Sequence, residues 1–219
     1  MQTRGLLNEE LQLIRHELAI MAAKVEEDLG KALVVLRSGD ISLAEEALAS
    51  EEIINNLQLK IDDMALTLVA TQQPVASDLR ELVTVFKISS SLERIGDYCV
   101  HLIKAAVKLS SRAAFRSMER IERMVITGQQ MLKDAFSAYL ARDAEAARKS
   151  AVLDTQIDIE HKALTEEVLA LMKKQPQLVK PAARLLRLSG NMERLGDHIT
   201  NICEGIIFMT EGNREELNN

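Results

Sequence analysis

The stretch SLERIGD at residues 91–97 recurs almost unchanged as NMERLGD at residues 191–197. The first glutamates of the two stretches, Glu93 and Glu193, are 100 positions apart (193 − 93). The residues just upstream also correspond, because KIS at 87–89 matches RLS at 187–189. Two unrelated amphipathic helices would rarely share a Glu-Arg-x-Gly-Asp motif in register, so the sequence indicates an internal duplication.

The correspondence reaches further upstream with a slightly different spacing. Asp40 and Asp143, each in a polar turn, are 103 positions apart (143 − 40), and at that spacing Ile54 aligns with Ile157. The spacing between equivalent residues falls from 103 to 100 near the second turn of each half. A duplicated helical hairpin followed by a third helix explains both spacings, so residues 40–110 should superpose on 143–210.

Helix-breaking residues are scarce, with three Pro and nine Gly in 219 residues. Apolar residues recur every three or four positions, as on one face of a helix. We therefore predict an all-α fold of two tandem three-helix bundles, residues 1–110 and 111–219, related by a pseudo-twofold. The first of the six long helices should end near residue 38. The other five should span about 41–70, 78–109, 118–141, 143–174 and 178–210, and the tail beyond them should be frayed.

The composition argues against a nucleic-acid-binding, membrane-spanning or secreted protein. The net charge of −6 and the lack of a basic stripe interleaved with aromatic residues argue against binding to nucleic acid. No apolar run approaches the roughly 18 residues that a membrane span needs, and the N-terminus does not resemble a signal peptide. Cys99 and Cys203 lie in apolar helical patterns and are expected to be core residues in a reducing compartment. These features predict a cytoplasmic location.

The repeated motif places two carboxylates four residues apart in each half. These pairs are Glu93 with Asp97 and Glu193 with Asp197. Residues four apart lie on one side of a helix, with about 6 Å between them. The preceding helices carry a similar spacing, and the residues concerned correspond at the spacing of 103: Glu51 and Asn55 in the first half, Asp154 and Asp158 in the second.

The hairpin turns place these pairs opposite one another. The position midway between the pair at 51/55 and the pair at 93/97 is Pro74, which lies in the predicted turn. In the second half the midpoint falls within Gln175-Pro176-Gln177. Residues equidistant from the turn of an antiparallel hairpin face each other, so each hairpin should bring its four polar side chains together.

Converging carboxylates either raise one another's pKa or attract a counter-charge. Oxygen ligands suit Mg, Ca or Mn, and carboxylate clusters with water also suit iron and zinc. The alternative is a solvated acidic face neutralised by Arg94 and Arg194. Each Arg follows its Glu directly and should point about 100° around the helix, away from the pair. The predicted metal ligands are Glu51, Asn55, Glu93, Asp97, Asp154, Asp158, Glu193 and Asp197.

The chain carries no motif of an enzyme nucleophile, no Gly-rich phosphate loop and no Cys-x-x-Cys. A ferritin-like di-metal enzyme would need Glu-x-x-His on two helices, and this sequence contains none. The four histidines do not repeat between the halves and are expected to be structural. We therefore predict a non-enzyme, with the di-metal enzyme and a metal-free helical scaffold as the alternatives.

With these residues identified, the chain resembles the PhoU family over nearly its whole length. The resemblance rests on QQPV at 72–75 followed by DLR at 78–80, on the two Glu-Arg-x-Gly-Asp motifs, and on TNI at 200–202. It implies two three-helix bundles that carry multinuclear iron or zinc clusters on the acidic motifs. Asn55 departs from the family pattern, which prefers a carboxylate there.

The resemblance also implies a function through protein partners. A protein of this family is expected to act as a negative regulator of the phosphate-starvation response. It would link the ATPase subunit of a phosphate ABC transporter to a sensor histidine kinase, as a homodimer. It would reach the membrane only through these partners, on the cytoplasmic side.

Overall fold

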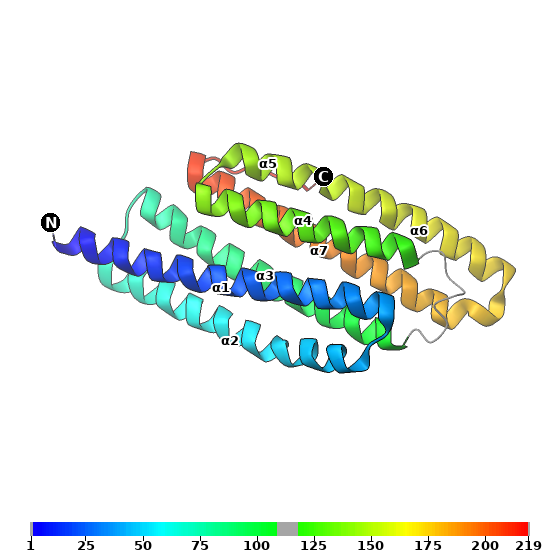
Figure 1. Ribbon diagram of the computed structural model, residues 1–219. Helices are drawn as coiled ribbons and strands as arrows, with labels where there is room; N and C mark the ends of the chain where they lie inside the picture. Colours follow the sequence, from blue (N-terminus) through cyan, green and yellow to red (C-terminus); the bar gives the residue numbers. More distant parts are fainter. Residues whose placement is uncertain (1, 109–117, 219) are drawn as a thin grey trace.

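Three long helices form the first half of the chain in the computed structural model, which describes residues 2–108 and 118–218 (Figure 1). The Asp40 carboxylate accepts hydrogen bonds from the backbone N–H groups of Ser42 and Leu43, so it caps the second helix. The turn around Pro74 separates the second helix from the third. The three helices are α1 (Gln2–Ser38), α2 (Ile41–Gln72) and α3 (Ser77–Lys108).

The second half repeats this arrangement with one difference. Asp143 caps its helix through the N–H of Ala146, and Pro176 lies in the turn before the last helix. The elements are α4 (Met118–Ala141), α5 (Ala144–Val152), α6 (Asp154–Lys174), the 3-10 helix η2 (Pro176–Leu178) and α7 (Val179–Glu211). The described residues contain no β-strand. The predicted all-α class is confirmed.

The single helix expected over 143–174 is interrupted at Leu153, so that prediction was wrong in detail. The Leu153 N–H donates to Ser150 O at 3.1 Å, and the Gln156 N–H donates to Leu153 O at 2.9 Å. Both bonds span three residues, which tightens the chain locally and starts a new helix. The break places Asp154 in the first turn of α6, where a carboxylate interacts favourably with the helix dipole.

The two halves pack along a seam formed mainly by α3 and α7 (Figure 1). Near one end of the seam, Lys87 Nζ lies 2.8 Å from Glu204 Oε2, and the Thr84 hydroxyl donates to Gly205 O at 3.1 Å. In the middle, the rings of Tyr98 and His198 lie 5.8 Å apart. Tyr98 and His198 are equivalent positions of the repeat. The pseudo-twofold axis therefore passes between them, as the predicted duplication requires.

The predicted domain boundary between residues 110 and 111 lies outside the described residues and stays a prediction. Cys99 and Cys203 are buried, as expected. Burial raises the pKa of the Cys203 thiol to about 12, so it stays protonated and unreactive. Among the described helices, none combines the length and the apolarity that crossing a bilayer would need.

The tail beyond α7 was expected to fray, and the structure contradicts this as far as residue 218. Gly212 has φ of +80°, a conformation that suits glycine, and it ends the helix with a bond to Phe208 O. The Leu217 N–H then donates to Glu204 Oε1 at 3.0 Å. Arg148 contacts the carboxylates of Glu211 and Glu215, each at 2.6 Å. These contacts fold the tail back along α7.

Candidate metal centres

The hairpin of α2 and α3 brings the first acidic set together across the helix pair. Burial raises the pKa of the Glu93 carboxyl, and the charges of Asp97 and Glu51 raise it further, while Arg94 lowers it. The pKa of Glu93 is therefore affected by one carboxylate on its own helix, Asp97, and by one on the facing helix, Glu51. This is the opposition that the position of Pro74 predicted. Asn55 is half-buried on the same helix as Glu51.

In the second set Asp158 is exposed, but the carboxyl of Asp154 is strongly affected by burial and by its acidic neighbours. Burial raises the pKa of Asp154 to about 7, and the charges of Asp158, Asp197 and Glu193 add to the rise. Burial also raises the pKa of Asp197, and the charges of Glu193 and Asp158 raise it further, while the charge of Arg194 lowers it. All four predicted residues of the second half, two from α6 and two from α7, thus interact with one another.

Asp154 points into this set with one oxygen that lacks a partner. Its Oδ2 lies 3.3 Å from the Thr200 hydroxyl. Its Oδ1 is buried and accepts no hydrogen bond from the described residues. A buried carboxylate oxygen without a donor costs free energy unless a cation or a proton satisfies it. The donor set and this unpaired oxygen fit an oxygen-ligated cation.

Gly196 makes room for the Asp154 carboxylate. A Cβ atom at Gly196 would overlap Asp154 Oδ1 and lie 3.1 Å from Ile157 Cδ1. At the equivalent Gly96, a Cβ would meet only the side chain of Ile54, at 3.0 Å from its Cδ1. The repeated glycines therefore have different neighbours. In the second half the glycine adjoins a predicted ligand directly.

The two sets also differ in their cationic neighbours. Arg94 Nε lies 3.5 Å from Glu93 Oε2, and Arg94 Nη1 lies 3.4 Å from Asp97 Oδ2. The expectation that this Arg points away from its pair was therefore wrong. Lys104 Nζ lies 3.9 Å from Glu51 Oε2. In the described part of the chain, no Lys, Arg or His comes within 4.0 Å of the four second-half carboxylates.

The eight predicted ligands are thus divided into two acidic sets as expected, but ligation itself stays a prediction. Among the described side chains, no three His, Cys, Asp or Glu residues are grouped as they would be around one ion. Were a metal to bind, carboxylates from both helices of a hairpin would hold it: Glu51, Glu93 and Asp97 with the Asn55 amide, or Asp154, Asp158, Glu193 and Asp197. The ion would neutralise like charges that otherwise repel across the helix pair.

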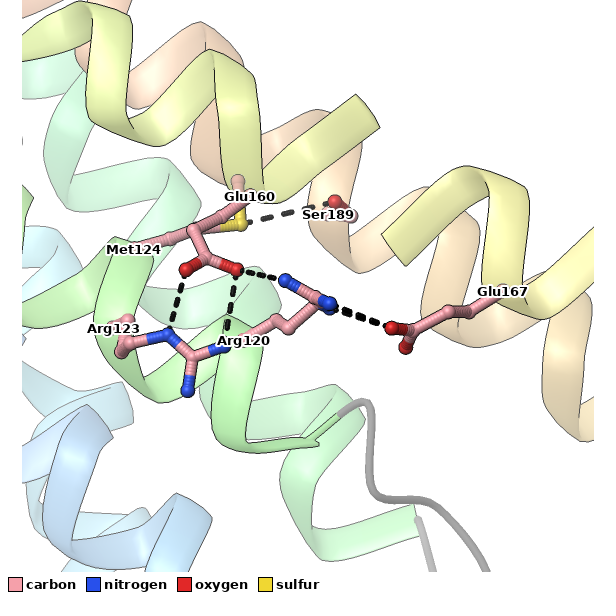
Figure 2. A network of polar contacts seen from close by, with 6 residues as sticks. All are labelled: Arg120, Arg123, Met124, Glu160, Glu167 and Ser189. Atoms are coloured by element: carbon pink, nitrogen blue, oxygen red, sulfur yellow. Dashed lines mark hydrogen bonds and ion pairs between the residues drawn. The ribbon is translucent and has the colours of Figure 1, made fainter. Parts of the chain in front are cut away.

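Polar contacts with α4 hold α6, which carries half of the second set (Figure 2). Arg120 lies 2.6 Å from both Glu160 and Glu167, and Arg123 Nε lies 2.7 Å from Glu160 Oε1. The two Arg side chains lower the pKa of the Glu160 carboxyl. Exposed pairs contribute little singly, but a network of four groups fixes the position of one helix on another.

The histidines have contacts of a structural kind. His161 Nδ1 and the Ser189 hydroxyl are 2.8 Å apart, which ties α6 to α7. His198 packs against Tyr98 at the seam, and burial lowers its pKa. His101 is exposed on α3. None of these three is grouped with the described acidic residues as a metal ligand would be.

One ionic cluster was missed by the sequence analysis. Glu81 on α3 is only 1% exposed and accepts a bond from Arg15 Nη2 of α1 at 2.8 Å. Arg142, which follows α4, also contacts this carboxylate. The cluster therefore ties the two repeats together. Glu81 stands at the helical spacing of the buried Val85 and Ile88, and an acidic residue on that apolar face was the available signal.

The raised pKa of Asp154 predicts a pH-dependent stability. Without metal, the folded protein binds a proton here that the unfolded chain releases at the ordinary pKa of 3.8. The contribution to stability is therefore complete below pH 3.8 and is lost as the pH rises through about 7. Thermal unfolding of chelator-treated protein should show this fall. The fall should be smaller in Asp154→Asn, and an equal fall in that variant would contradict the assignment.

Fold and site together define a class of protein. This is an all-helical, two-repeat protein with an acidic face on each hairpin, and its sequence lacks any nucleophile motif. The chain belongs to the PhoU family, because the PhoU domain model matches residues 18–106 and again residues 121–206. The two matches fall on the two repeats.

Relatives match over nearly their full length. A protein of Clostridium acetobutylicum named phosphate-specific transport system accessory protein PhoU homolog is 30% identical over 217 residues, 99% of each chain. A Caulobacter vibrioides protein of the same name is 35% identical over 95% of this chain and 90% of its own.

Solved structures agree with the fold. PhoU from Pseudomonas aeruginosa superposes with a TM-score of 0.89 at 29% identity, covering 94% of this chain and 99% of that one. The phosphate transport system regulatory protein PhoU from Streptococcus pneumoniae gives a TM-score of 0.88 at 30% identity and covers 96% and 99% of the two chains. The resemblance noted from the sequence is thus confirmed as family membership.

Proposed function

We propose that this protein is an accessory protein of phosphate-specific transport that represses the phosphate-starvation response when phosphate is plentiful. The observation that carries the proposal is the match over 99% of both chains to a relative named as such an accessory protein. A match of this extent argues that the whole molecule and not one borrowed domain serves the role.

The partners under this proposal are the ATPase subunit of a phosphate ABC transporter and a sensor histidine kinase, met at the cytoplasmic face of the membrane. The protein acts through contacts and not through turnover, which agrees with the absence of a nucleophile motif in the sequence. Long exposed helix faces suit such contacts, and a homodimer would present two copies of each face. No nucleic-acid partner is proposed, because the net charge is −6.

Metal clusters, of iron or zinc, complete the proposal, although Mg or Mn would also suit the oxygen donors. When bound, the metal supplies positive charge between the two helices of each hairpin. The unpaired Asp154 Oδ1 and the cleared space at Gly196 support this site in the second half. The ferritin-like alternative lacks support, because its Glu-x-x-His motif does not occur in the sequence.

Deletion of the gene tests the regulatory proposal. In phosphate-rich medium, the deletion strain should express phosphate-starvation genes that the parent keeps silent, measured as reporter activity from a starvation promoter. Restoring the intact gene should silence the reporter again. If the reporter stays silent in the deletion strain while the purified protein turns over a small molecule, the regulatory reading is wrong.

A further inference from the structure

The seam between the repeats carries two equivalent pockets. One is lined by Thr84, Lys87, Glu204 and Gly205 together with residues of the tail. The other, of about 540 Å³, has at its rim the residues 100 positions away: Arg184, Arg187, Lys104 and Ala105. Because α3 and α7 exchange places under the pseudo-twofold, the two pockets lie at opposite ends of the same helix pair.

The two equivalent pockets differ in charge. In the first pocket Lys87 and Glu204 form an ion pair at 2.8 Å. Their counterparts in the second pocket are Arg187 and Lys104, so a cation replaces the anion of the pair. Among the described residues, none that lines the second pocket is acidic. A protein with a net charge of −6 thus holds a concave site at which described cationic and neutral side chains converge.

The basic side chains of the second pocket lie on two helices that border it. Arg184 and Arg187 are three residues apart on α7, and His101 and Lys104 are three apart on α3. Residues at this spacing share a helix face, so two pairs border the pocket from its two sides. In the described part of the chain, neither Arg is bonded to a carboxylate. Lys104 has one acidic neighbour, Glu51, at the long distance of 3.9 Å.

We infer that this pocket binds small soluble anions that carry several phosphate groups. Guanidinium groups match phosphate oxygens with two parallel hydrogen bonds, and an ammonium adds a point charge. A pocket of about 540 Å³ exceeds one phosphate and suits a short chain of them. The first pocket is less suited to anions, because Glu204 pairs with its Lys87, and the two acidic tail residues Glu215 and Glu216 outnumber the one tail cation, Arg214.

Titration calorimetry of the purified full chain with tripolyphosphate tests the inference independently of the regulatory proposal. The protein is treated with chelator first, so that metals on the acidic sets do not contribute. The parent should bind, and added salt should weaken the binding. The double variant Arg184→Gln/Arg187→Gln should bind about tenfold more weakly or worse. Lys104→Glu, which restores the charge pattern of the first pocket, should do the same.

The matched control is Lys87→Gln, which removes a cation from the equivalent position of the first pocket and should leave tripolyphosphate affinity unchanged. All four substituted side chains lie at least partly in solvent, and thermal unfolding verifies that each variant folds. Equal binding by parent and variants, or no binding by the parent, would overturn the inference. So would binding only to phosphatidylglycerol vesicles, since the phosphate would then come from a lipid surface.

Discussion

We expect Gly196→Ala to weaken metal binding at the second acidic set by about 10- to 100-fold, the range for changes that displace a ligand from its support. The new Cβ would occupy the position of Asp154 Oδ1, so this carboxylate must rotate away from Asp158 and Asp197. The chain itself should stay folded, because the overlapping atom is the end of a flexible side chain. Calorimetric titration of chelator-treated, untagged protein with zinc measures the effect.

Two other glycines provide matched controls for this substitution. A Cβ at Gly190, on the same helix, meets nothing within 4 Å, so Gly190→Ala should leave metal affinity unchanged. It should also stabilise α7 by about 1 kcal/mol through helix propensity. At Gly96 the neighbour is the apolar Ile54 side chain, so Gly96→Ala should spare the ligands of both sets. Equal loss of zinc affinity in all three variants would show that Gly196 has no special relation to the site.

The two acidic sets should bind metal unequally, the second more tightly. It offers four carboxylates, whereas the first offers Glu51, Glu93 and Asp97 with the neutral Asn55. In addition, Arg94 lies within 4.0 Å of two carboxylates of the first set. Cation affinity rises with the charge of the ligands, and a cluster of several cations needs each charge. The residue types favour this order of affinities, and the Arg94 contacts strengthen it.

Exchanging carboxylate and amide at the equivalent positions 158 and 55 tests this order of metal affinities in both directions. Asp158→Asn should weaken the second site by roughly tenfold, and Asn55→Asp should strengthen the first by a similar factor. Both side chains are accessible to solvent, so neither change should disturb the core. Equal affinities of the two sites in the parent, or unchanged affinity in Asn55→Asp, would contradict the role assigned to position 55.

The sequence predicted the helices and the opposition of the acidic pairs because both follow from periodic patterns. The turns at Pro74 and Pro176 determine which positions of each hairpin face one another, and the two Glu-Arg-x-Gly-Asp motifs reveal the duplication. Asp40 and Asp143 were both identifiable as turn residues, and in the structure each caps the helix that follows it. Each of these features can be recognised from a pattern in the linear sequence.

The features that were missed depend on tertiary contacts. No proline or glycine marks the break at Leu153, which shows only in two backbone bonds that span three residues. The tail is held by Arg148 of α5, more than sixty positions away, and not by any local signal. The Glu81 cluster joins α1, α3 and the residue after α4, so only the folded molecule shows that Arg15 and Arg142 neutralise it.

Anomalous X-ray diffraction at the iron and zinc absorption edges, from crystals of untagged protein, tests the central claim most directly. The claim is that each acidic hairpin face of this PhoU protein holds metal. We predict a strong anomalous peak between α6 and α7, bordered by Asp154, Asp158, Glu193 and Asp197. A weaker peak should lie between α2 and α3. Anomalous maps without a peak at either face, from crystals soaked in both metals, would contradict the account.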